Sequence, residues 1–154
     1  MGNLVLRRAT KEDMGDILKM QLDIFHGEQK IPPDLVYLFM EKEPQCWVAV
    51  LGNSIVGAVA AWKENGQAHW GRFVTKQNYR GLHIGTALAA FSFDDLFAQR
   101  IESIYMEARE SAAKIVCKMG GKVVGKTVPF YESTVTPIVL QKKDFYKYKA
   151  EITP

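Results

Sequence analysis

Residues 80–86, RGLHIGT, place an arginine and two glycines directly before a run of small, helix-forming residues. The first N–H groups of a helix lack partners within it, and the helix dipole adds a partial positive charge there. Glycine lets a ligand come close to the backbone, Arg80 adds a full positive charge, and Thr86 adds a hydroxyl group. The pattern predicts a site for a phosphate or pyrophosphate; the alternative is a plain turn at a helix entry.

The spacing of the two glycines narrows the class of phosphate ligand. No lysine follows Gly85, so the segment is not the phosphate loop of ordinary ATP and GTP sites. The interval from Gly81 to Gly85 also differs from the G-x-G-x-x-G pattern of dinucleotide sites. The sequence therefore disfavours these nucleotide sites and leaves another phosphate-bearing ligand.

Alternating and periodic apolar residues predict a mixed α/β chain around this segment. Strands are expected at residues 4–8, 46–51, 54–62, 67–75 and 103–108, with a closing hairpin from 122–130 and 134–143. Helices are expected from the N-cap Thr10 through Phe25, at 33–43, at about 84–100 and at 110–119. The order strand, helix, strand over residues 67–108 predicts a parallel crossover, with the glycine turn at the carboxyl end of the first strand. Open α/β sheets bind ligands at that end.

The composition limits the class of protein. The chain has 154 residues, of which 47% are hydrophobic, enough for one folded domain. A net charge of +3 is too weak to indicate nucleic acid, and the basic cluster at residues 142–149 is expected to be a solvated terminal strand. The N-terminus lacks a signal-peptide pattern, and no apolar run has membrane-spanning length. Cys46 and Cys117 match no metal or disulfide pattern, so a cytoplasmic protein without a metal is expected.

The segment RGLHIG, residues 80–85, resembles the Arg/Gln-x-x-Gly-x-Gly/Ala signature of the GNAT superfamily of N-acetyltransferases. Four further segments resemble elements of that family in the family's order: LRRATKEDMGDILKM, CWVAVLGNSIVGAVAAW, FVTKQNYRG and AAKIVCKMGGKVVG. The resemblance covers about residues 4–143 and leaves 144–154 as a C-terminal tail. It implies a single α/β domain with a mixed, mostly antiparallel sheet, a parallel pair of fourth and fifth strands, and about four helices.

The resemblance implies that acetyl-coenzyme A (acetyl-CoA) is the cosubstrate and that no metal is needed. Its pyrophosphate is expected on Arg80, Gly81, Leu82, His83, Ile84, Gly85 and Thr86, and its pantetheine arm on the backbone of Phe73, Val74 and Thr75. A strand that bonds a ligand loses part of its own ladder, often through a bulge, which is expected in strand 67–75. His83 stands where the family has glycine, and a negative φ just inside the helix is expected to accommodate it.

Two residues are candidates for taking the proton of the acceptor amine. His69 lies eleven residues before Arg80, where histone-type members of the family carry a glutamate base, and histidine suits proton transfer at neutral pH. Glu107 is the rival, and the alternative for His69 is a side chain that only fills a strand face. His26 and Glu28 fall in the expected loop between the first two helices, where the family meets its acceptor; otherwise both belong to an exposed polar loop.

Departures from the family pattern bear on the chemistry. The tyrosine that often protonates the leaving thiolate is replaced by Val116, and the asparagine that helps to hold the pantetheine arm falls near Arg109. Cys117 is expected to be buried and inert rather than a nucleophile, because no histidine that could activate it is near in sequence.

These features together predict an N-acetyltransferase that moves an acetyl group directly from acetyl-CoA to a primary amine. The expected partner is a small-molecule or peptide amine, and binding to nucleic acid or to a membrane is not expected. A homodimer is possible, because dimers are common in the family that the sequence resembles. The acceptor is open among protein N-termini, lysines, polyamines, amino sugars and drug-like amines. Two other functions stay open: a non-catalytic acyl-CoA-binding regulatory module, and a nucleic-acid-binding protein that uses the basic C-terminal segment.

Overall fold

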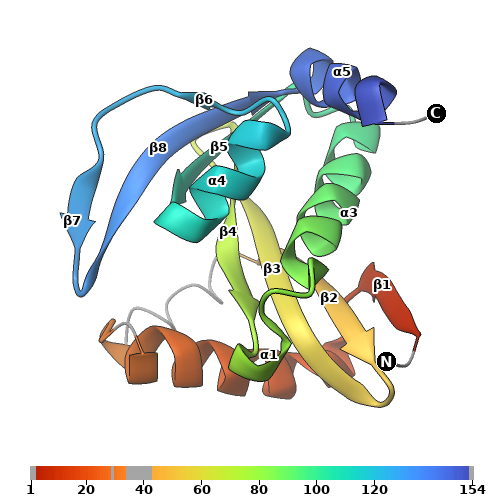
Figure 1. Ribbon diagram of the computed structural model, residues 1–154, viewed down its shortest axis with the longest axis vertical. Helices are drawn as coiled ribbons and strands as arrows, with labels where there is room; N and C mark the ends of the chain where they lie inside the picture. Colours follow the sequence, from red (N-terminus) through yellow and green to blue (C-terminus); the bar gives the residue numbers. More distant parts are fainter. Residues whose placement is uncertain (1–2, 29, 34–42, 153–154) are drawn as a thin grey trace.

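The computed structural model of the chain describes residues 3–28, 30–33 and 43–152 (Figure 1). The strands are β1 (Leu4–Arg8), β2 (Gln45–Leu51), β3 (Ser54–Glu64), β4 (Gln67–Thr75), β5 (Ser103–Ala108), β6 (Lys122–Val123), β7 (Val128–Phe130) and β8 (Ser133–Gln141). The α-helices are α1 (Met14–Gln21), α3 (Ile84–Ala98), α4 (Glu110–Lys118) and α5 (Lys142–Ile152). Short 3-10 turns lie at η1 (Lys11–Asp13) and η4 (Gln77–Tyr79), and a π-helical segment, η2 (Leu22–Glu28), continues α1.

The strands form one sheet in the order β1-β2-β3-β4-β5-β8-β6, and β7 pairs with β8 beside this path. Among the described strands, the pair β4–β5 is parallel and the other pairs are antiparallel. The helix α3 makes the crossover between β4 and β5, as the order of elements predicts. The predicted mixed sheet with one parallel pair is therefore confirmed.

Helices cover both faces of the sheet. Side chains of α1 and η2 pack with alternate residues of β2, β3 and β4, including Val48, Ala60 and Val74. Side chains of α3, α4 and α5 pack with the other set, including Trp47, Val59 and Trp70. The alternation of side chains along each strand thus divides the core into two clusters, one on each face.

Helix α3 is apolar around most of its circumference because it is enclosed by the sheet, α4 and α5. Its buried residues are Ile84, Leu88, Ala89, Ser92, Phe93, Leu96 and Phe97. Ser92 is polar but satisfied: its hydroxyl accepts a hydrogen bond from Trp70 Nε1 at 2.9 Å and donates to the Ala89 carbonyl at 2.8 Å. The rigid start of this helix matters because the glycine turn leads directly into it.

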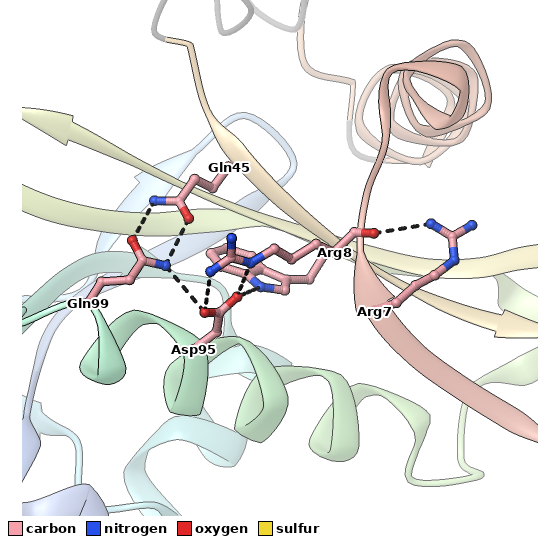
Figure 2. A network of polar contacts seen from close by, with 6 residues as sticks. Arg7, Arg8, Gln45, Asp95 and Gln99 are labelled. Carbon is pink, nitrogen blue, oxygen red and sulfur yellow. Dashed lines mark hydrogen bonds and ion pairs between the residues drawn. The ribbon is translucent and has the colours of Figure 1, made fainter.

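A polar network joins β1 and β2 to the outer end of α3 (Figure 2). The Arg8 guanidinium makes a two-pronged ion pair with the Asp95 carboxylate, which also accepts a hydrogen bond from Trp47 Nε1 at 2.8 Å. Gln99 donates to the same carboxylate and exchanges two hydrogen bonds with Gln45. The Arg8 guanidinium, followed by the other donors, lowers the pKa of Asp95 to about 2.

The parallel pairing of β4 with β5 is short. It is made at Ala68–Ile104 and His69–Tyr105, although β4 continues to Thr75. On the other side of β4, the register with β3 shifts, because Gly71 pairs with Ala60 while Val74 pairs with Ala58. The extra residue in this stretch is a β-bulge, so the predicted interruption of the ladder is confirmed. It falls where β4 and β5 cease to pair.

The first helix extends further along the chain than the spacing of its apolar residues predicts. Thr10 and Asp13 form the reciprocal contacts of a capping box before α1, as the sequence indicates. The chain does not leave the helix at His26, because the π-helical segment η2 carries it through Glu28. The second expected helix, residues 33–43, lies almost wholly outside the described residues.

The expectation of a solvated terminal strand at residues 142–149 is wrong. These residues belong to helix α5, and the Phe145 side chain is fully buried. Its ring packs against Phe93 and Phe97, with centroids 5.7 and 5.6 Å away. Tyr148 follows three positions later and packs against the same cluster. The burial of two aromatic residues at helical spacing outweighs the charge of the surrounding lysines, of which Lys143 and Lys147 are exposed.

Candidate active site

The glycine turn begins after η4, with Arg80 in extended conformation and Gly81 at φ +82°. Helix α3 starts at Ile84, and its N-cap His83 has φ +62° and ψ +15°. The expected negative φ of His83 is therefore wrong: this residue adopts the left-handed conformation that glycine occupies most easily. Histidine is among the side chains that tolerate this region, so the backbone path survives the departure from glycine.

Gly85 is needed because the first turn of α3 lies close against β4. A Cβ atom at this position would lie 3.0 Å from Phe73 Cζ and 3.6 Å from Thr75 Oγ1. The absence of a side chain thus leaves a narrow space between the helix start and the strand. Backbone N–H groups of the first helical turn are the donors that an anion would meet there.

This space opens into a cavity of about 430 Å³, here named the loop cavity. It is lined by Ile24, Phe73, Val74, Thr75, Tyr79, Arg80, Gly81, His83, Ile84, Gly85, Thr86, Arg109, Ser111 and Ile115. Every residue predicted to hold the cosubstrate is in this set except Leu82, whose side chain is exposed. The structure therefore brings β4 and the glycine turn together around one cavity.

Arg80 is already held in an anion-binding geometry. Its guanidinium makes a two-pronged contact with the Glu28 carboxylate, with N–O distances of 3.0 and 3.3 Å, and its Nε donates to the Thr75 carbonyl at 2.9 Å. Glu28 therefore lies beside the glycine turn and not in the second cavity described below. His26, from the same π-helical segment, is exposed and makes a hydrogen bond through Nδ1 to the Ile31 carbonyl at 3.1 Å.

A second cavity of about 480 Å³, here named the aromatic cavity, lies where β4 and β5 no longer pair. It is lined by Phe25, Ile31, Trp62, His69, Trp70, Gly71, Arg72, Phe73, Met106, Glu107, Ala108, Arg109, Ser111, Ala112, Phe130 and Val135. Both predicted proton acceptors, His69 and Glu107, are in this set. Phe73, Arg109 and Ser111 line both cavities, so the two meet at these residues.

His69 is held by aromatic neighbours. Its ring stacks on Trp62 with centroids 5.8 Å apart and meets the edge of Tyr105 at 5.2 Å. Its Nε2 atom lies 3.7 Å from Glu64 Oε2, which is too far for a hydrogen bond. The side chain is only 18% exposed, so the imidazole is oriented and partly enclosed at the closed end of the β4–β5 gap.

Two arginines of the aromatic cavity were not among the predicted site residues. Arg72 lies in the β-bulge with φ +56°, and its guanidinium lies over the Phe25 ring at 5.6 Å. Burial lowers the pKa of Arg72 to about 10. Arg109 is the N-cap of α4, and burial, followed by the charge of Arg80, lowers its pKa. The resemblance places the family's asparagine near Arg109, which was a usable signal, whereas the sequence around Arg72 contained no such signal.

The remaining chemical candidates lie away from the cavities. Val116, at the position of the family tyrosine, is fully buried and lines neither cavity. Cys117 is exposed, so its expected burial is wrong: it occupies the outer face of α4, one residue beyond the buried face. It lines neither cavity. Cys46 is buried, and this burial raises the pKa of its thiol to about 11.

Two properties of the described residues bear on membranes and metals. None of their helices is long and apolar enough to cross a membrane. No group of three or more His, Cys, Asp or Glu side chains among them is arranged to hold a metal ion.

Solved structures of acyltransferases share this fold. A Pseudomonas aeruginosa acyl-CoA N-acyltransferase is 15% identical with a TM-score of 0.76, over 89% of this chain and 99% of that one. A GNAT-family acetyltransferase from Staphylococcus aureus is 18% identical with a TM-score of 0.69, over 90% and 99%. A Vibrio cholerae spermidine N-acetyltransferase, solved with CoA and spermine, is 15% identical with a TM-score of 0.69, over 93% and 98%. At these identities the likeness establishes the fold alone.

The sequence itself matches a family. No curated protein sequence matches the chain. The profile of the family described as "Acetyltransferase (GNAT) family" matches residues 13–125, which include α1, the strands β2 to β6, the glycine turn and every lining residue of the loop cavity. This match spans well over half of the chain, and the fold and the loop geometry agree with it. The chain belongs to the acetyltransferase (GNAT) family.

Proposed function

We propose that this protein is an acetyl-CoA-dependent N-acetyltransferase that transfers the acetyl group directly to a primary amine. One observation carries the proposal: the loop cavity, lined by the glycine turn, and the aromatic cavity, lined by His69 and Glu107, meet at Phe73, Arg109 and Ser111. This arrangement suits a reaction between an anionic cosubstrate and an amine that enter from separate sides. Related folds with similar ligands support it: one neighbour is a spermidine N-acetyltransferase with CoA, and another is the NatC complex with a Gag peptide and CoA.

The loop cavity fits a pyrophosphate. Gly81 has a positive φ, Gly85 leaves a space that a Cβ would narrow, and Arg80 receives a carboxylate in two-pronged geometry. We assign the pyrophosphate to Arg80 and to the first-turn N–H groups of α3, with Glu28 leaving Arg80 as the phosphate arrives. Beyond His69, the edge of β4 that no longer pairs with β5 has backbone groups available for the pantetheine amides.

The chemistry needs positioning and a path for two protons: one leaves the ammonium group before the attack, and the other leaves the attached nitrogen and ends on the CoA thiolate as the carbon–sulfur bond breaks. Acetyl-CoA, when bound, supplies a thioester whose carbonyl carbon is open to attack by a neutral amine. His69 or Glu107 takes the proton of the acceptor's ammonium group, so that the nitrogen lone pair is free. Backbone N–H groups of β4 near the bulge, where β4 no longer pairs with β5, would stabilise the charge that develops on the carbonyl oxygen. The residues from both cavities orient the two reactants, which is a large part of such catalysis.

A second candidate is an acyl-CoA-binding regulatory module without turnover. It is favoured by Val116, because a buried valine replaces the tyrosine that often protonates the leaving thiolate. Release of free thiol from acetyl-CoA in the presence of a panel of amines separates the two functions. Tight CoA binding without amine-dependent thiol release would support the regulatory module.

The experiment that tests the cosubstrate site uses Gly85→Glu, with Gly15→Glu as the matched control. A glutamate at 85 brings bulk against Phe73 and a negative charge into the anion site, whereas an added Cβ at Gly15 on α1 has no atom within 4 Å. Calorimetry with CoA should give an affinity at least about tenfold weaker for Gly85→Glu, because a like charge faces the phosphates. Unchanged CoA affinity in a folded Gly85→Glu protein would show that the cosubstrate binds elsewhere.

A further inference from the structure

The aromatic cavity contains an unusual pair of charges. Most of its lining is apolar or aromatic, with Phe25, Trp62, Trp70, Phe73, Met106 and Phe130 among the larger side chains. Two guanidinium groups, from Arg72 and Arg109, line the same cavity. Glu107 supplies a carboxylate to the lining, and His69 supplies an imidazole. Among the described lining residues, guanidinium groups therefore outnumber carboxylates, in a space that is otherwise suited to a flat, apolar body.

The local backbone conformation sets the position of both arginine side chains. Arg72 takes φ +56° in the β4 bulge, and this local geometry directs it over Phe25 at 5.6 Å. Arg109 caps the start of α4 and lies near Arg80 and Glu28, whose charges act on it. Both side chains are partly removed from water. A charge that is partly desolvated is a strong partner for a ligand of opposite charge.

We propose that the acceptor amine carries a carboxylate and an apolar, preferably aromatic body, and that Arg72 and Arg109 bind the carboxylate. This inference rests on the proposed function and specifies its substrate class. Guanidinium groups match carboxylates in shape and bind them through two parallel hydrogen bonds. The aromatic lining receives the apolar body, and the amine is left toward His69 and Glu107.

The same charges disfavour a polyamine. A second or third ammonium group in this cavity would lie beside two guanidinium groups, and like charges in a partly enclosed site cost binding energy. The likeness in fold to a spermidine N-acetyltransferase therefore does not make a polyamine the expected acceptor of this protein. We therefore expect the two proteins to differ in the amines that they acetylate.

The test compares acceptors that differ by one group. L-Phenylalanine and phenethylamine share an aromatic body and an amine, but only the first has a carboxylate, and spermidine serves as the polycation. Thiol release from acetyl-CoA gives kcat/KM for each. The wild-type protein should prefer phenylalanine to phenethylamine by at least about tenfold, and Arg72→Gln and Arg109→Gln should each reduce that preference about tenfold, mainly through KM.

Lys114→Gln is the matched control, because it removes one positive charge from the exposed face of α4 outside both cavities. It should keep the wild-type preference. Equal or faster turnover of phenethylamine or spermidine by the wild-type protein would overturn the proposal while leaving the acetyltransferase function intact. So would an unchanged preference in both arginine variants.

A binding measurement tests the carboxylate site even if the protein transfers the acetyl group to none of these three amines. Calorimetry with 3-phenylpropionate, which has the carboxylate and ring but no amine, should show binding that weakens at least about tenfold in Arg72→Gln. No binding to the wild-type protein would overturn the carboxylate site. Failure to bind CoA in the same preparation would instead count against the proposed function, so the two failures are distinguishable.

Discussion

At the scale of single residues, His69 is the side chain whose placement best suits proton transfer. Trp62 and Tyr105 fix its ring, and it lines the aromatic cavity at the closed end of the β4–β5 gap. His69→Gln should lower kcat/KM by about a hundredfold or more, in line with the usual contribution of a general base. CoA affinity should not change, because His69 does not line the loop cavity.

The pH dependence of kcat/KM makes this prediction specific. A protonated base cannot accept the amine's proton, so the wild-type profile should have an acidic limb along which the rate falls. His69→Gln should lose this acidic limb, and His69→Glu should recover part of the rate. Glu107→Gln is the comparison variant from the same cavity. An intact acidic limb and a near-normal rate in His69→Gln would assign the base role to Glu107 or to solvent.

The loop residues were predictable at this scale, and Arg72 was not. The loop could be predicted because glycines and an arginine directly before a helix indicate an anion site by their residue types alone. All predicted residues of the loop except Leu82 line one cavity. Strand alternation from Trp70, which packs on α3, places Arg72 on the α3 face. The bulge redirects it to Phe25 on the opposite face. The position of a bulge depends on pairing between strands, which the local sequence does not specify.

At the scale of elements, the Arg8–Asp95–Trp47 network joins β1 and β2 to α3. The pKa of Asp95 is lowered to about 2 in the folded protein, against about 3.9 for an unfolded chain. A lowered folded-state pKa stabilises the protein above pH 4, and this stabilisation is lost as the pH falls toward 2. Since Arg8 is 61% exposed, we discount the effect to about 1 to 2 kcal/mol.

Urea unfolding of the wild-type protein and Asp95→Asn across pH 2 to 7 measures this contribution. The variant should be less stable at neutral pH, and the two free energies of unfolding should converge between about pH 5 and pH 2. Asp16→Asn, which changes an exposed carboxylate of α1, is the control and should follow the wild-type curve. A stability difference that stays constant with pH would mean that the ion pair does not lower the pKa of Asp95.

Helix α5 gives a second prediction at this scale. Phe145→Ala should lower the free energy of unfolding by about 3 kcal/mol or more, because it empties a fully buried aromatic position between Phe93 and Phe97. The neighbouring Tyr146 is 43% exposed, so Tyr146→Ala should cost about 1 kcal/mol or less. Urea denaturation compares the two. Equal costs would show that α5 is a peripheral helix and not a part of the core.

The elements themselves were largely predictable, with two informative exceptions. Alternating apolar residues predicted the strands β1 to β5 close to their observed bounds, because burial of one face of a strand is a local property. Helix α5 was missed because its lysines dominate the composition, and only Phe145 and Tyr148 mark its buried face. The π-helical segment η2 was missed because its wider turn has no sequence periodicity that differs from an ordinary helix end.

At the scale of the whole molecule, the two cavities are assembled from segments far apart in sequence. The loop cavity is lined by residues from η2, β4, η4, α3 and α4, and the aromatic cavity adds residues from β3, β5 and the β7–β8 hairpin. A ligand that binds across these segments binds the folded chain and not the unfolded one. Its binding free energy therefore adds to the stability of the whole domain.

Free CoA at about a hundred times its Kd should stabilise the protein by about 2.7 kcal/mol, which raises Tm by about 5 to 10 °C for a domain of this length. The shift should shrink at high salt, because Arg80 is 42% exposed and its attraction for phosphate is screened. A thermal-shift titration at low and high salt measures both effects. Gly85→Glu, whose new carboxylate occupies the anion site, should show little shift, while Gly15→Glu should respond as the wild-type protein does. A full shift in Gly85→Glu would place the CoA site outside the loop cavity, since that carboxylate would then face no phosphate.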